Sequence, residues 1–183
     1  ARLGDRRGVL WSAALAATAL GDGDVAAGLW RDLGFTVRLS SGGMPIVDDV
    51  PPRQVRVPSK DAGYGFVRGP REGFEVVWVT PLSPGHGVVS SASFRDCPVD
   101  YGDLVLFDGA PVAQDPPVFP LLEILKAGDE RRLRFAALLK AGDLEALADA
   151  LPEGVRVFAY PEGREVDRER LVYGKLVVPA AID

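Results

Sequence analysis

The sequence predicts an α+β protein in which a short pair of helices precedes a strand-rich region. Residues 8–20 are rich in Ala and Leu, and residues 25–33 place apolar side chains at helical spacing. Beyond residue 52 the chain consists mainly of short runs rich in Val, Phe, Tyr and Trp, bounded by Gly, Pro or Asp. We therefore divide it into a helical hairpin (1–38), a linker (39–52) and a strand-rich α+β domain (53–183).

Composition excludes several classes of protein. The chain has 183 residues, of which 47% are hydrophobic and 26% are charged, values that are ordinary for globular proteins. A formal net charge of −5 disfavours general binding to nucleic acid or to anionic membranes. One cysteine and one histidine cannot form a disulfide scaffold or a zinc finger. We expect no cofactor, no metal, no nucleic-acid or membrane partner, and a cytoplasmic, bacterial-type protein.

The helical hairpin is predicted from its turn. Residues 21–24 read Gly-Asp-Gly-Asp, which supplies a glycine to end the first helix and an aspartate to cap the second. Gly34 ends the second helix. The short connection implies that the two helices run antiparallel.

Residues 8–35 of this hairpin resemble a single tetratricopeptide repeat, a helix–turn–helix unit of about 34 residues. The resemblance rests on small residues where the helices approach, glycine at the turn and an aromatic residue in the second helix: Ala14, Ala17, Gly21, Ala26 and Trp30. The sequence departs from the family pattern at Leu10 and Leu33, and no proline follows the second helix. The remainder of the chain resembles no family in this way.

A single unit of this kind cannot bury its own apolar faces, so something must cover it. The candidates are further repeats upstream, the remainder of this chain or a second copy. Residue 1 is not methionine, and the only methionine is Met44, which favours the first candidate, a longer helical-repeat protein that ends with this chain. The residues expected to contact the stacked partner are Trp11, Leu15, Leu29 and Trp30.

The strand-rich domain is predicted from six apolar runs. Val76 to Val79 is apolar at every position, which is typical of a strand covered on both faces, whereas residues 53–57 alternate, as half-exposed strands do. A compact sheet or small barrel accommodates both patterns, and we expect the last strands to return to the same sheet. The six runs are 55–57, 74–80, 87–90, 104–107, 155–160 and 171–178.

A three-helix insertion is predicted between the fourth and fifth of these strands, at about residues 117–151. Pro120 suits the first turn of a helix. The tetrapeptide Lys-Ala-Gly-Asp occurs at 126–129 and again at 140–143, and each copy offers a basic last turn, a glycine stop and an aspartate cap.

One group of residues has the types that thiol catalysis requires. Cys97 is the only cysteine and His86 the only histidine, and Asp96 and Asp100 flank the cysteine. A thiol nucleophile needs a base that forms the thiolate and an acidic group that orients the base. No cysteine-hydrolase signature surrounds Cys97, and free cysteines are commonly buried, so a purely structural role is the competing interpretation.

The sequence therefore favours a non-catalytic protein–protein interaction or scaffold module. It would bind another protein, or a second copy of itself, through the N-terminal helices, because their apolar faces need a cover. The alternative is a thiol-dependent hydrolase or transferase that uses Cys97 and His86.

Overall fold

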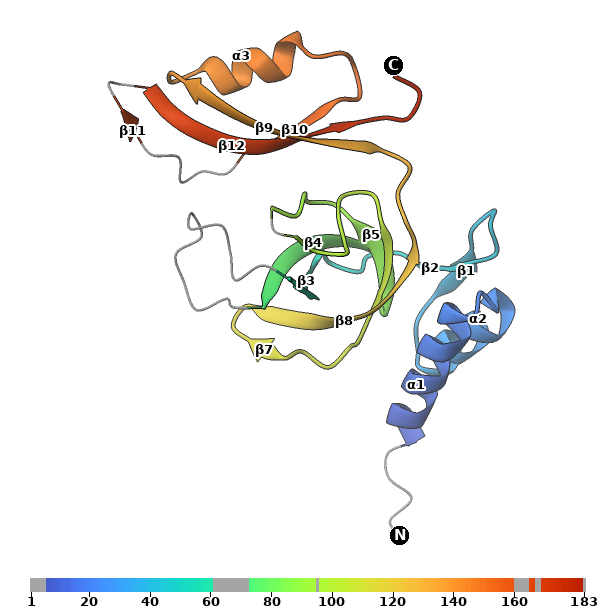
Figure 1. Ribbon diagram of the computed structural model, residues 1–183. Coiled ribbons are helices and arrows are strands. Elements are labelled where there is room, and N and C mark those ends of the chain that lie inside the picture. The colour runs from blue at the N-terminus through green and yellow to red at the C-terminus, as the bar shows by residue number, and fades with distance from the viewer. Residues whose placement is uncertain (1–5, 61–72, 95, 160–164, 167–168, 183) are drawn as a thin grey trace.

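The computed structural model describes residues 6–182, apart from 61–72, 95, 160–164 and 167–168. Figure 1 shows three parts in chain order: a helix pair with a small hairpin, a β-barrel, and a curved sheet with one helix. The predicted α+β class is confirmed. In the described part of the chain, every helix is too short, or not apolar enough, to cross a membrane.

The N-terminal part contains helices α1 (Arg6–Ala19) and α2 (Gly23–Asp32), so the predicted helix pair is confirmed. The aspartate cap is Asp22, whose carboxylate accepts a hydrogen bond from the Val25 amide at 3.3 Å. Strands β1 (Val37–Leu39) and β2 (Pro45–Val47) then form an antiparallel hairpin. Since Val37 and Val47 join the same core as the helices, the segment expected as a linker is in fact packed structure.

The middle part is a small closed barrel of five strands. Successive strands pair in antiparallel fashion, and a parallel pairing of the first with the last, in which Val55 lies opposite Phe119, closes the barrel. Its interior is filled mainly by valines, and the alternation at residues 53–57 points Val55 and Val57 inward. The barrel strands are β3 (Arg53–Pro58), β4 (Phe74–Ser83), β5 (His86–Val89), β6 (Leu104–Phe107) and β8 (Pro117–Lys126), and the short β7 (Ala113–Gln114) pairs with β8.

The C-terminal part is a separate antiparallel sheet centred on one long strand. That strand, β12, pairs with β9 along one side and with β10 and β11 along the other. The last strands therefore do not return to the barrel sheet, contrary to the prediction. The elements are β9 (Arg131–Leu139), α3 (Asp143–Ala150), β10 (Arg156–Ala159), β11 (Glu165–Val166) and β12 (Glu169–Val178).

The predicted three-helix insertion at 117–151 is wrong, because α3 is the only helix in that range. The first Lys-Ala-Gly-Asp joins two strands, and only the second precedes a helix. There Gly142 has φ 88°, and the Asp143 carboxylate accepts a hydrogen bond from the Lys140 amide at 2.7 Å. Arg, Leu and Ala favour helix locally, but pairing with β12, far along the chain, holds residues 131–139 as a strand.

Candidate functional site

The apolar face of the helix pair packs against the barrel of the same chain. Trp30 is completely buried and Leu15 nearly so, while Trp11 and Leu29 are half-buried in the same core. The Trp11 ring meets the Trp30 ring edge-on, with 4.9 Å between centroids. At the turn between β4 and β5, Gly85 lies so close to Leu15 and Trp30 that a Cβ would collide with Leu15.

The same closeness recurs at a second barrel turn, where Gly109 lies against the Trp11 ring and leaves no room for a Cβ. The sequence allowed three candidates for covering the helices: upstream repeats, the remainder of this chain or a second copy. In the structure, the remainder of this chain covers their inward face. The four residues predicted to bind a partner contribute to packing inside the molecule.

His86 lies at this junction and is completely buried. Its Nδ1 atom is 2.5 Å from the Ser83 hydroxyl, which also accepts a hydrogen bond from the Gly85 amide at 3.3 Å. Its Nε2 atom finds no hydrogen-bond partner among the described residues. Burial lowers the pKa of His86 to about 4, so the imidazole is neutral near pH 7. The ring has a place in packing but no access for a substrate.

Cys97 lies at the other end of β4. Its thiol donates a hydrogen bond to Glu75 at 3.4 Å, and burial, followed by the negative charge of Glu75, raises the pKa of the thiol to about 12. Glu75 is the second residue of the ten-residue strand β4 and Ser83, the partner of His86, is the last. A strand rises about 3.3 Å per residue, which separates the two ends by about 26 Å. The structure does not bring the thiol and the imidazole together.

Of the two aspartates proposed for thiol chemistry, Asp96 is exposed, and the carboxylate of Asp100 is engaged elsewhere. The Asp96 carbonyl accepts a hydrogen bond from the Lys60 amide at 3.0 Å. Asp100 accepts from the Ser93 and Tyr101 amides at 3.1 and 2.8 Å and forms an ion pair with Lys175. Neither aspartate orients His86, whose imidazole is hydrogen-bonded to the Ser83 hydroxyl.

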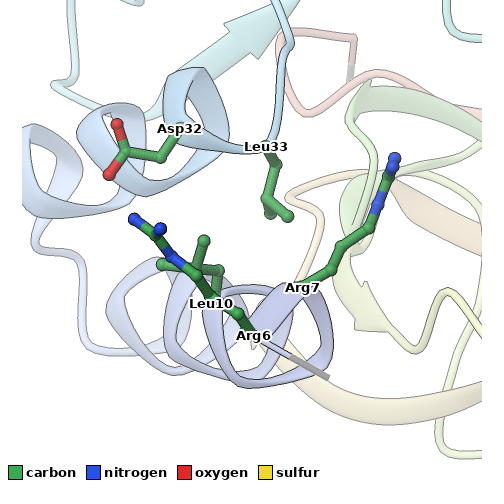
Figure 2. Close-up of a pocket in the computed structure, with 5 residues that line it drawn as sticks. All are labelled: Arg6, Arg7, Leu10, Asp32 and Leu33. Carbon is green, nitrogen blue, oxygen red and sulfur yellow. The ribbon is translucent and has the colours of Figure 1, made fainter. Parts of the chain in front are cut away.

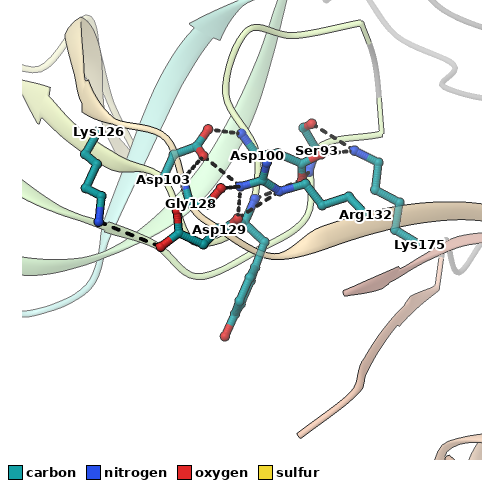
Figure 3. Close-up of polar contacts among 9 residues, drawn as sticks. Ser93, Asp100, Asp103, Lys126, Gly128, Asp129, Arg132 and Lys175 are labelled. Atoms are coloured by element: carbon teal, nitrogen blue, oxygen red, sulfur yellow. Dashed lines mark hydrogen bonds and ion pairs between the residues drawn. The ribbon is translucent and has the colours of Figure 1, made fainter. Parts of the chain in front are cut away.

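The polar residues that are brought together lie instead between the barrel and the C-terminal sheet (Figure 3). Asp103, only 3% exposed, accepts hydrogen bonds of 2.8 Å from the amides of Asp100 and Gly128 and from the Arg132 guanidinium. Arg132 also donates to the Tyr101 carbonyl at 2.7 Å. The Lys175–Asp100 ion pair lies beside the Asp103–Arg132 ion pair. Two buried ion pairs therefore join loop 90–103 to β9 and β12.

This junction was missed in the sequence because its partners are far apart along the chain, by 29 residues for Asp103 with Arg132 and by 75 for Asp100 with Lys175. The Lys175 ammonium also donates to the Ser93 hydroxyl at 3.3 Å. A serine beside a lysine is the pair used by some hydrolases, in which neutral lysine acts as the base. Here the Lys175 ammonium is paired with Asp100 and Ser93 is 1% exposed, so the arrangement holds the two parts together.

No cluster of three or more potential metal ligands occurs in the described part of the chain. An open groove between α1 and the end of α2 is lined by two arginines, an aspartate and two leucines (Figure 2). Its charged side chains, Arg6, Arg7 and Asp32, are all exposed and carry both signs. Nothing in this groove resembles a built ligand site.

The sheet of the C-terminal part has one face toward the barrel and one away from it. Arg132, Lys175 and Phe158 lie on the first face, where Phe158 stacks near Tyr101 with 5.4 Å between ring centroids. The register then places a set of apolar residues on the second face, here called the outer face: Leu133, Phe135, Ala137, Leu139, Val157, Ala159, Val172, Leu176 and Val178.

Helix α3 lies over the outer face (Figure 1), yet none of its side chains is buried. Leu133 on this face remains 51% exposed, whereas Val172 and Val178 are at most 8% exposed and the other apolar residues of the face are half-buried. Leu138, which is 58% exposed, lies on the opposite face of the same strand. The outer face is therefore an apolar surface that α3 covers incompletely, with Leu133 left exposed.

The fold and these sites define a small barrel protein with a helix pair packed against one side and a sheet that is incompletely covered by one helix on the other side. Comparisons with protein-family models, with curated proteins and with solved structures found no match.

Proposed function

We propose that this protein is a non-catalytic protein-interaction module that binds through the outer face of its C-terminal sheet. The observation that carries this proposal is the apolar character of that face over three strands, combined with a covering helix in which no side chain is buried. The support from exposure comes from Leu133, the exposed member of this apolar face, because contiguous apolar surface that reaches solvent is typical of interaction sites.

The position of the surface differs from the one expected in the sequence. Trp30 and Leu15 cannot offer contact area to a partner without separating the helices from the barrel, because both are buried against Gly85. Leu133 can do so directly, because half of its surface is exposed to solvent. The tetratricopeptide resemblance and a role within a longer helical-repeat protein remain proposals.

The chemistry of the described side chains also supports an interaction role over thiol catalysis. A thiol with a pKa of about 12 is almost entirely protonated near pH 7, and thiolate is the reactive form. The carboxylate beside it disfavours the thiolate, whereas catalytic cysteines lie beside cations.

Photo-crosslinking tests this proposal. A benzoylphenylalanine is introduced at Leu133 of the full chain, and a control chain carries it at Leu20, which is 83% exposed at the end of α1. Both are irradiated in a lysate of the source cells. We expect position 133, but not position 20, to capture one discrete polypeptide.

Competition makes the result specific. Excess unlabelled wild-type chain should abolish the crosslink, and excess Leu133→Glu chain should not, since the charge disrupts the apolar contact. Equal capture from both positions, or no capture from position 133, would show that the outer face is not an interaction surface.

A further inference from the structure

We infer that the partner of the C-terminal sheet is a second copy of this chain, which pairs antiparallel with strand β9. The inference rests on the proposed function and names its partner. Within the part of the chain that the structure describes, β9 pairs on one side only, with β12, over nine residue pairs without a register shift.

An edge strand of this length is exposed to pairing with other strands, because its outward N–H and C=O groups lack partners in the sheet. Proteins commonly protect such edges with charged side chains, especially lysine, with proline or with a bulge. β9 carries three arginines in its first half, but its second half, residues 135–139, has neither a charge nor a proline, and its pairing shows no bulge. The other strands beside β12, β10 and β11, are four and two residues long and offer much shorter edges.

The charge pattern of β9 is what points to a second copy. The strand reads Arg-Arg-Leu-Arg-Phe-Ala-Ala-Leu-Leu, so its first half is basic and its second half is apolar. An antiparallel pair with twofold symmetry about Phe135 places Arg131 opposite Leu139, Arg132 opposite Leu138, and Arg134 opposite Ala136 of the second copy. No two arginines face each other directly. A parallel pair in register would place arginine opposite arginine, which is destabilising.

The same pairing covers the exposed leucines. Leu133 would lie opposite Ala137 of the second copy, on the outer face, and the two Phe135 side chains would meet at the twofold axis. Leu138 would lie opposite Arg132 of the second copy, on the face toward the barrel. The two outer faces would then form one continuous apolar surface, flanked on each side by a copy of α3.

Sedimentation equilibrium of the purified full chain over a range of concentrations tests the pairing. We expect a reversible monomer–dimer equilibrium. Ala136 is exposed and is expected to face Arg134 of the second copy, so it offers a matched pair of variants. Ala136→Arg places like charges opposite each other twice per dimer and should raise the dissociation constant about ten-fold. Ala136→Glu places opposite charges there and should leave the constant unchanged or lower it.

Leu20→Arg serves as the control, because it changes an exposed leucine to arginine far from β9 and should not alter association. Thermal unfolding at dilute concentration verifies that each variant folds. A wild-type chain that remains monomeric at every concentration overturns the inference, as does an equal weakening by Ala136→Arg and Ala136→Glu. If the protein is monomeric but benzoylphenylalanine at position 133 still captures another polypeptide, the proposed function stands without self-pairing. If position 133 captures nothing, both proposals fail.

Discussion

Replacing Trp30 with alanine tests whether the helix pair is closed by its own chain. Trp30 is the largest completely buried side chain in the described part of the molecule. Its ring packs edge-on against Trp11 and Phe35, with centroids 4.9 and 5.9 Å away, and its indole nitrogen lies 3.4 Å from the Thr18 hydroxyl. The substitution removes all of these contacts and opens a cavity beside Gly85.

The magnitude follows from the burial. An aromatic side chain of this size buries roughly 150–250 Å². At about 25 cal/mol per Å² this corresponds to about 4–6 kcal/mol as an upper value, of which alanine retains a small part. Measured tryptophan-to-alanine changes in cores cost about 3–5 kcal/mol, and we expect the same here. In a chain of this length the midpoint of thermal unfolding should fall by about 6–20 °C.

Trp78 provides the matched control, because it is a tryptophan on the barrel that is 47% exposed. Trp78→Ala loses about half as much buried area and leaves no closed cavity, so it should cost about 1–2 kcal/mol. Urea unfolding followed by far-ultraviolet circular dichroism compares the two variants with the wild type. Equal losses for Trp30→Ala and Trp78→Ala would refute the packing of the helices on the barrel.

Three further predictions concern titratable groups. Because burial lowers the pKa of His86 to about 4, the unfolded chain binds the additional proton, and His86 should contribute a loss of stability as the pH falls from 6.5 toward 4. Unfolding measured across this range should show a weaker pH dependence for His86→Gln, and identical slopes would contradict the assignment. Alkylation of Cys97 by iodoacetamide at pH 7.5 should be at least about ten-fold slower than that of free cysteine, because its pKa is raised to about 12; an equal or faster rate would indicate an activated thiol. Asp103→Ala leaves the partly buried Arg132 without its carboxylate and should cost about 2–4 kcal/mol in urea unfolding, whereas a loss below about 0.5 kcal/mol would mean that the ion pair does not hold the C-terminal sheet to the barrel.

Local sequence signals predicted the elements whose determinants are local. The glycine-rich turn at residues 21–24 marks the end of α1 and the start of α2 to within a few residues. All six predicted strand runs are strands in the structure, and the alternation at residues 53–57 identifies Val55 and Val57 as inward-facing. In these segments the intrinsic preference, the apolar pattern and the final environment agree.

The elements that could not be predicted depend on distant partners. β9 is made of good helix formers and becomes a strand because β12, some 40 residues later, pairs with it. Likewise, β8 becomes a strand by pairing with β3 on one side and β6 on the other. The candidate site shows the same limit. Cys97 and His86 are close in sequence, but His86 is the first residue of β5 and pairs with the end of β4, whereas Cys97 contacts the start of β4. Sequence proximity therefore gave the wrong expectation of spatial proximity.

The barrel joins the helix pair and the C-terminal sheet by different chemistry. This difference suits the proposal that the helices are structural and that the sheet binds a partner. The helix pair is held by buried apolar rings, so separating it from the barrel would expose Trp30 and Leu15 to water. The C-terminal sheet is held by ion pairs through Asp103 and Asp100, which fix its orientation and keep Leu133 on the face away from the barrel. An interaction surface held at a fixed angle to the barrel is the consequence.

Hydroxyl-radical footprinting of the full chain, at a concentration low enough to keep it monomeric, tests most directly that the helix pair is closed against the barrel and that strand β9 is exposed to solvent. Mass spectrometry of the digested chain compares the oxidation of Leu15 and Trp30 with that of Leu133 and Leu138, each relative to the chain unfolded in urea. The structure predicts strong protection of the first two residues, which are at most 8% exposed, and little protection of the two leucines of β9, which are 51% and 58% exposed. Oxidation of Trp30 at the rate of the unfolded chain, or protection of Leu133 as strong as that of Leu15, would contradict it.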